Sequence, residues 1–252
     1  MSDTPSHQAQ SGQNLNKQQV VLLHGLGRSP RSMRKLEKVL TQRGYKVLNA
    51  GYIGLVGDYQ AILKKLILEL TDWVDPSSAI HFVGHSFGGI LIRGLLNQCG
   101  SQWTLGRCVM LGTPNQGTST ASYMSTHPIL KCFTPEVAKQ LTPESELIRS
   151  LPEPTIETGV IAGSKSSSIL VPVTWFYNVA TNNAPGDGVV EINNTQCSNM
   201  SDFLVMPLHH SFMMWDSRLI EQVIHFLRFA KFEHLQPAQD NQGAQTNQSE
   251  NG

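Results

Sequence analysis

One short stretch limits most strongly what this chain can fold into. An apolar run at residues 79–83 is broken by a Gly-His-Ser-Phe-Gly pentapeptide at residues 84–88, and apolar side chains then return at helical spacing. This pattern predicts a strand, a very tight turn and a helix. A serine on such a strained turn is approached closely by backbone, so Gly84 and Gly88 fit positions that must lack a Cβ. The helix directs free N–H groups and its positive end toward Ser86, which suits an anionic intermediate.

The same alternation of strand and helix runs along most of the chain. Short loops join the elements, which predicts the α/β class: a mostly parallel central sheet of about six strands flanked by helices. In such sheets the ligand site lies beyond the carboxyl ends of the strands. His24, Ser86 and Thr113 all follow apolar runs directly and are expected at that edge. The strands are expected at residues 19–23, 45–49, 79–85, 107–111, 156–161 and 203–206.

The 252 residues suit one α/β domain. We expect it at 19–234, between a flexible polar leader at 1–18 and a disordered polar tail at 235–252. The helical pattern weakens at 118–154, which fits either a cap or lid over the site or ordinary surface packing. The stretch 162–186 is expected to be a long irregular connection with an apolar island at 171–177.

Charge and composition exclude several classes of protein. Lys plus Arg and Asp plus Glu number 19 each, so no long-range field favours nucleic acid or an acidic membrane. No apolar run is long enough to span a bilayer, and the polar N-terminus lacks a secretory pattern. The four cysteines show no metal-like spacing and are expected to be reduced thiols. These features predict a soluble cytoplasmic protein. They do not indicate its oligomeric state.

The candidate chemistry is that of an activated serine. A serine hydroxyl is a weak nucleophile that needs a base, and an imidazole base needs a carboxylate to fix its tautomer. Asp187 follows the penultimate predicted strand and His210 follows the last one. Each lies where a loop at the carboxyl edge of the sheet can reach Ser86. The catalytic residues are therefore predicted to be Ser86, Asp187 and His210.

Other carboxylates and histidines compete for these roles. Asp202 precedes the last strand and is expected at its amino end, Asp216 is expected to cap the final helix, and Glu191 is expected to face elsewhere. His209 and His210 are adjacent, so only one of them can face the serine. The likelier role of His24 and His85 is packing and hydrogen bonding of the loops.

A developing oxyanion needs two backbone donors. The expected donors are the N–H of Phe87, which follows the nucleophile, and the N–H of Leu26 in the loop after the first apolar strand. Because main chain supplies both donors, the two side chains are expected to matter mainly for pocket shape.

Five motifs together resemble the α/β-hydrolase superfamily, specifically the lipase/esterase branch of small bacterial lipases and deacylases of inositol-phospholipid anchors. They cover His-Gly-Leu-Gly at 24–27, Gly-His-Ser-Phe-Gly-Gly at 84–89, Leu-Gly-Thr-Pro at 111–114, Gly-Asp-Gly-Val-Val at 186–190 and His-Ser-Phe-Met at 210–213. In this superfamily the triad follows the chain order serine, acid, histidine. In this branch the histidine stands just before a short polar-apolar helix, which favours His210 over His209.

The resemblance implies hydrolysis of a small-molecule or lipid ester through an acyl-enzyme, with no metal or organic cofactor and with transient contact to a lipid interface as one option. Acyl transfer, or hydrolysis of a thioester or amide on the same triad, remains an alternative because fold does not decide substrate. A catalytically silent binding protein on the same fold is the alternative from another class. A nucleotide-binding protein is excluded, because no glycine-rich loop has phosphate-binding spacing.

Overall fold

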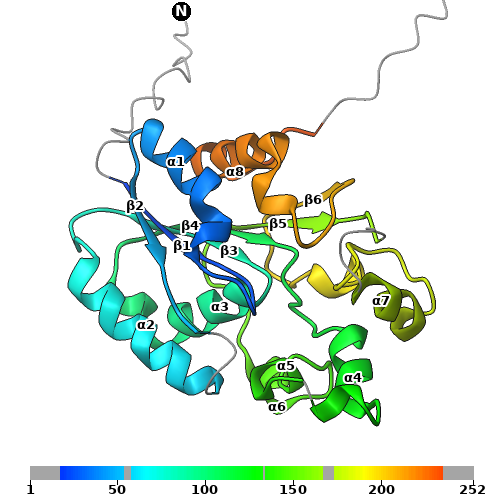
Figure 1. Ribbon diagram of the computed structural model, residues 1–252. Helices are drawn as coiled ribbons and strands as arrows, with labels where there is room; N and C mark the ends of the chain where they lie inside the picture. The colour runs from blue at the N-terminus through cyan, green and yellow to red at the C-terminus, as the bar shows by residue number, and fades with distance from the viewer. Residues whose placement is uncertain (1–17, 54–57, 133, 167–172, 235–252) are drawn as a thin grey trace, which may run out of the picture.

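The centre of the fold is a parallel β-sheet, seen in a computed structural model that describes residues 18–53, 58–132, 134–166 and 173–234 (Figure 1). Within these residues the sheet has six strands in the order β2-β1-β3-β4-β5-β6, and every neighbouring pair is parallel. The predicted α/β class is thus confirmed. The strands are β1 Gln19–Leu23, β2 Lys46–Ala50, β3 Ile80–His85, β4 Leu105–Leu111, β5 Thr158–Gly163 and β6 Asp202–Met206.

The central strands of the sheet are buried on both faces. Every residue of β1, β3 and β5 is buried, as expected for central parallel strands that helices cover on both sides. One core cluster lies against α2 and α3, and a second lies against α1 and α8 (Figure 1). The covering helices are α1 Arg34–Gln42, α2 Tyr59–Trp73, α3 Phe87–Cys99 and α8 Ser217–Phe229.

Two of the covering helices begin at aspartate caps. The Asp58 side chain accepts a hydrogen bond from the N–H of Ala61 at 2.8 Å and begins α2. Asp216 accepts from the N–H groups of Arg218 and Leu219 and begins α8. The predicted cap role of Asp216 is thus confirmed, which removes it as a rival for the catalytic acid.

The region 118–154 consists of short helical pieces. They are α4 Ser119–Thr126, a 3-10 helix at Leu130–Cys132, α5 Glu136–Lys139 and α6 Glu146–Ser150. Figure 1 shows these pieces gathered at one end of the molecule beside α7, and α4 packs directly against α7.

The prediction of an irregular connection at 162–186 is wrong in part. Helix α7 occupies Val173–Thr181 and lies against α4, although its sequence is rich in β-branched and aromatic residue types of low helix propensity. Val171 and Pro172 of the expected apolar island lie outside the described residues, as do 1–17 of the leader and the tail 235–252. Shorter 3-10 turns lie at Pro30–Met33, Gly100–Gln102, Asn193–Thr195 and Met213–Trp215.

Candidate active site

Ser86 lies on the tight turn between β3 and α3. Its φ of 53° and ψ of −123° are in a region that non-glycine residues rarely adopt, and its N–H donates to the carbonyl of Leu111 at 2.8 Å. Glycine is needed on both sides of Ser86, because a Cβ at either position would collide with neighbouring backbone. A Cβ on Gly84 would lie 2.6 Å from the backbone nitrogen of Gly89, and one on Gly88 would lie 2.2 Å from the carbonyl oxygen of Leu23. The predicted need for glycine at both positions is confirmed.

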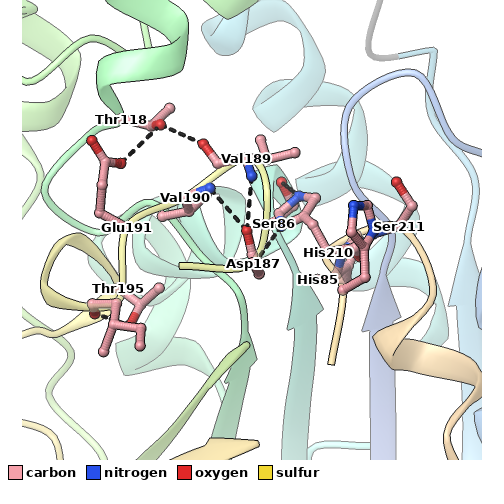
Figure 2. Close-up of polar contacts among 12 residues, drawn as sticks. His85, Ser86, Thr118, Asp187, Val189, Val190, Glu191, Thr195, His210 and Ser211 are labelled. Carbon is pink, nitrogen blue, oxygen red and sulfur yellow. Dashed lines mark hydrogen bonds and ion pairs between the residues drawn. The ribbon is translucent and has the colours of Figure 1, made fainter. Parts of the chain in front are cut away.

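The side chains of Ser86, His210 and Asp187 form one continuous hydrogen-bonded relay (Figure 2). Ser86 Oγ lies 3.0 Å from Nε2 of His210, and Nδ1 of the same ring lies 2.7 Å from Oδ2 of Asp187. The structure thus brings together all three side chains that the sequence singled out. Asp187 is fully buried, and the side chains of Ser86 and His210 are only 8% and 7% exposed.

Asp187 is fixed by its own loop as well as by His210. Its Oδ1 accepts hydrogen bonds from the N–H groups of Val189 at 3.0 Å and Val190 at 2.9 Å. Its main-chain carbonyl accepts from the N–H of His210 at 2.9 Å, so Asp187 and His210 are joined by both backbone and side chain. Gly163 permits this approach, because a Cβ there would lie 2.6 Å from the Cβ of Asp187.

The ring of His85 packs against the ring of His210 (Figure 2). Its ring centroid lies 4.8 Å from that of His210, and its Nε2–H donates to the His210 carbonyl at 3.0 Å. Burial, and then the positive charge that His210 can carry, hold the pKa of His85 well below the usual value for histidine. His85 is therefore neutral at physiological pH and acts as a donor that fixes the backbone of the base loop.

The loop at residues 24–27 lies against the serine turn. A Cβ on Gly25 would lie 2.8 Å from Nδ1 of His85 and 3.1 Å from the Cβ of Ser86, so glycine is required for this close approach. Phe87 is fully buried at the first position of α3, and helix geometry leaves its N–H without an intrahelical partner. Leu26 occupies the adjoining turn and packs at the edge of the core. Both predicted oxyanion donors thus belong to backbone segments beside Ser86.

The rival residues lie away from the relay. Asp202 stands at the amino end of β6, where it accepts from the N–H of Phe232 at 2.7 Å and from Nε2 of His234 at 2.9 Å. The Nδ1 of His209 accepts from the N–H of Ser211 at 3.2 Å, and burial lowers the pKa of His209. The His24 ring stacks on Tyr52 at 4.1 Å, which agrees with the packing role expected of it.

Sequence reasoning missed the contacts that support the acid loop. Glu191 does face away from His210, but its buried carboxylate accepts from the N–H of Ser119 at 3.1 Å and lies 3.2 Å from the hydroxyl oxygen of Thr118. Thr118 also donates to the carbonyl of Val189 at 2.6 Å. These contacts join segments more than 70 positions apart, and no local pattern marks them.

The described residues contain neither a metal-binding cluster nor a membrane-spanning helix. Among them, no three His, Cys, Asp or Glu side chains gather in a way that could bind a metal ion. No helix in the described ranges combines the length and apolar character needed to cross a bilayer.

Comparison with solved structures identifies similar folds. The mature lipase BlEst2 of Bacillus licheniformis superimposes with a TM-score of 0.69 at 17% identity, over 89% of this chain and 96% of that one. A metagenomic carboxyl esterase gives 0.63 at 15% identity, over 82% and 69% of the two chains. Phospholipase PlaB of Legionella pneumophila gives 0.57 at 20% identity, over 71% of this chain and 45% of its own. At these identities the likeness shows the shared fold alone.

Comparison of the sequence with protein families gives a more specific result. Curated proteins include no match to this sequence. The sequence model described as palmitoyl protein thioesterase matches residues 19–176, which is more than half of the chain. Together with the lipase and esterase folds, this match confirms the predicted resemblance to the lipase/esterase branch of the α/β-hydrolases. The chain belongs to the palmitoyl protein thioesterase family, within the α/β-hydrolases of the esterase, lipase and thioesterase type.

Proposed function

We propose that this protein is a serine hydrolase that cleaves carboxylic esters through an acyl-enzyme formed on Ser86. The observation that carries the proposal is the relay from Ser86 Oγ through His210 to Asp187, with distances of 3.0 and 2.7 Å. Both are within the range in which a nucleophile, a general base and an orienting carboxylate work together.

The mechanism follows from the positions of the protons. His210 Nε2 takes the proton of the Ser86 hydroxyl as Oγ attacks the acyl carbon, and Asp187 stabilises the imidazolium and fixes its tautomer. The same Nε2–H then protonates the leaving alcohol, and the acyl group stays on Oγ. Water enters, gives a proton to His210 and attacks the acyl carbon. The acid is released as the proton returns to Oγ.

The oxyanion of each tetrahedral intermediate is assigned to two main-chain donors, the N–H groups of Leu26 and Phe87. Support comes from the position of Phe87 at the start of α3, where the partial positive charge of the helix terminus favours an anion. Gly25 supports the assignment of Leu26, because it brings that loop against the Cβ of Ser86.

A thioester is the second candidate substrate, and the family match specifically favours it. A thiolate leaves with less help from a general acid than an alkoxide does, so the same relay can serve both. Lipase and phospholipase neighbours support a lipid or other small ester as the partner. We propose the region 118–154 as the cover of the acyl site, since it follows β4 at the carboxyl edge of the sheet.

A matched pair of substrates tests this function. Purified protein and the Ser86→Ala variant are given an acyl oxoester and the thioester of the same acyl chain. We expect the wild-type protein to hydrolyse at least one of them, and Ser86→Ala to lose about 10³-fold or more in kcat. The ratio of kcat/KM for the two substrates then decides between esterase and thioesterase. If the substrate is consumed only when an alcohol or amine acceptor is added, and the acyl group is recovered on that acceptor, the protein is an acyltransferase instead.

A further inference from the structure

The support of Asp187 extends beyond its own loop to the start of α4. Residues 186–191 form a tight turn in which Gly186 and Glu191 pair as an antiparallel bridge. Within this turn the N–H of Val190 donates to Asp187 Oδ1 at 2.9 Å. The direction of that N–H therefore influences where the carboxylate points.

The carbonyl of Val189 and the N–H of Val190 belong to one peptide group. A peptide group is planar, so fixing its carbonyl also fixes the direction of its N–H. The Thr118 hydroxyl donates to this carbonyl at 2.6 Å, from the opposite side of the peptide to Asp187 (Figure 2). Thr118 thereby restricts rotation of the peptide that supports the acid.

Thr118 is itself fixed by several contacts. Its N–H donates to the carbonyl of Leu141 at 3.0 Å, and its Oγ1 accepts from the N–H of Thr120 at 3.3 Å as the cap of α4. The buried carboxylate of Glu191 lies 3.2 Å from the same Oγ1 and accepts from the N–H of Ser119. The hydroxyl has one proton, and its shortest acceptor is the Val189 carbonyl, so Glu191 fixes the α4 start rather than competing for that proton.

We propose that Thr118 is a positioning residue for the acid of the relay, acting through the peptide between Val189 and Val190, and that Glu191 assists it by fixing the start of α4. This inference rests on the proposed function, because it assigns a role within the Ser86 relay. It makes the first residue of the region 118–154 part of the support of the active site.

The matched pair Thr118→Val and Thr118→Ser tests the role. Valine keeps the shape and removes the hydroxyl, whereas serine keeps the hydroxyl. Because a small misplacement of a catalytic group is costly, we expect Thr118→Val to slow phosphonylation of Ser86 by a fluorophosphonate about tenfold or more. We expect Thr118→Ser to stay within about twofold of wild type, since it can still bond to Val189.

Asp58→Ala provides the control for loss of a helix cap. Asp58 caps α2, outside the region 118–154, through a bond from the N–H of Ala61 at 2.8 Å. It makes no contact with the acid loop among the hydrogen bonds of the described residues. Its removal should leave the phosphonylation rate unchanged even if it lowers the melting temperature as much as Thr118→Val does.

A spectroscopic readout separates positioning from general stability. The proton between His210 Nδ1 and Asp187 Oδ2 gives a downfield proton NMR resonance that reports this hydrogen bond directly. We expect it to shift or broaden in Thr118→Val and to stay in place in Thr118→Ser and Asp58→Ala. If Thr118→Val does not fold, Glu191→Met should slow phosphonylation about threefold or more while Glu191→Gln stays near wild type.

The outcomes separate this inference from the function on which it rests. A wild-type rate and an unshifted resonance in Thr118→Val would overturn the role of Thr118 while leaving the serine hydrolase intact. Equal rates for Glu191→Met and Glu191→Gln would overturn the role of Glu191. A folded wild-type protein that takes no phosphonate on Ser86 would overturn the proposed function and this inference together.

Discussion

Asp187 differs from the other carboxylates by what surrounds it. It is fully buried, receives two main-chain N–H groups on one oxygen and contacts His210 with the other. Asp202 also receives hydrogen bonds, but from residues at the amino end of the sheet. Hydrogen bonds alone therefore do not distinguish Asp187 from Asp202, whereas the contact with His210 does.

An asparagine at position 187 keeps the size of the side chain but cannot fix the imidazole tautomer in the same way. We expect Asp187→Asn to lower kcat about 10³- to 10⁴-fold. Asp202→Asn should keep kcat within about twofold, since Asp202 does not contact the relay. Steady-state hydrolysis by the two variants measures this. An inactive Asp202→Asn beside an unimpaired Asp187→Asn would show that the acid is misassigned.

The gathering of Ser86, Asp187 and His210 could be predicted from the sequence because each lies in a recognisable motif. The contact of Thr118 could not, because its partner is a main-chain carbonyl 71 positions away, and any residue at position 189 would supply that carbonyl. The contact of His85 with the carbonyl of His210 is hidden from the sequence for the same reason.

At the scale of elements, the turn between β3 and α3 depends on the close approach of β1. The Cα of Gly88 faces the carbonyl of Leu23, and α3 packs on β1 through this contact. The start of α3, and with it the proposed oxyanion donor at Phe87, is therefore positioned by β1.

Gly88→Ala tests this packing. The added Cβ would lie 2.2 Å from the Leu23 carbonyl oxygen, and rigid backbone cannot move away cheaply. We expect a loss of about 3 kcal/mol or more in the free energy of unfolding. Gly100→Ala is the matched control at the other end of α3. There the Cβ would meet only a Leu105 methyl group at 3.4 Å, and the φ of −56° suits alanine, so the change should stay within about 1 kcal/mol. Equal stability of both variants in chemical denaturation would contradict the close approach.

The strands and the long helices were predictable because burial on both faces or on one stripe leaves a strong apolar pattern. Helix α7 was not, because its sequence, Val-Thr-Trp-Phe-Tyr-Asn-Val-Ala-Thr, is rich in residues that favour strands or turns. Its helical state depends on tertiary contacts with α4, and such contacts leave no periodic signal in the chain.

At the scale of the whole molecule, the relay is assembled from three separate parts of the chain. Ser86 follows β3 in the interior of the sheet, Asp187 comes from the long connection between β5 and β6, and His210 follows β6 at the sheet edge. The family match ends at residue 176, so Asp187 and His210 both lie beyond it. Their placement depends on how β5 and β6 extend the sheet.

Asp202, at the start of the edge strand β6, joins this strand to the segment after α8 through hydrogen bonds with Phe232 and His234. Burial acts to raise the pKa of Asp202, but the hydrogen bonds from Phe232, His234 and Phe203 outweigh it and hold this pKa below the usual value. A depressed carboxyl pKa contributes stability that is present above the unfolded-state value and is lost as pH falls through the folded-state value.

Asp202→Asn should therefore reduce the free energy of unfolding by about 1 kcal/mol at neutral pH. The difference from wild type should shrink below about pH 4, as the wild-type carboxyl group becomes protonated. Denaturant unfolding of both proteins across this range measures the effect. A difference in the free energy of unfolding that stays constant down to pH 2 would contradict an ionised Asp202 that accepts a hydrogen bond from the N–H of Phe232.

The most direct test of the central claim is intact-protein and peptide mass spectrometry after exposure to a fluorophosphonate, with Ser86→Ala alongside. The relay predicts a single phosphonyl adduct, confined to Ser86, and no adduct on Ser86→Ala. A folded wild-type protein that stays unlabelled, or a Ser86→Ala variant that takes the same label, would contradict an activated serine at this site.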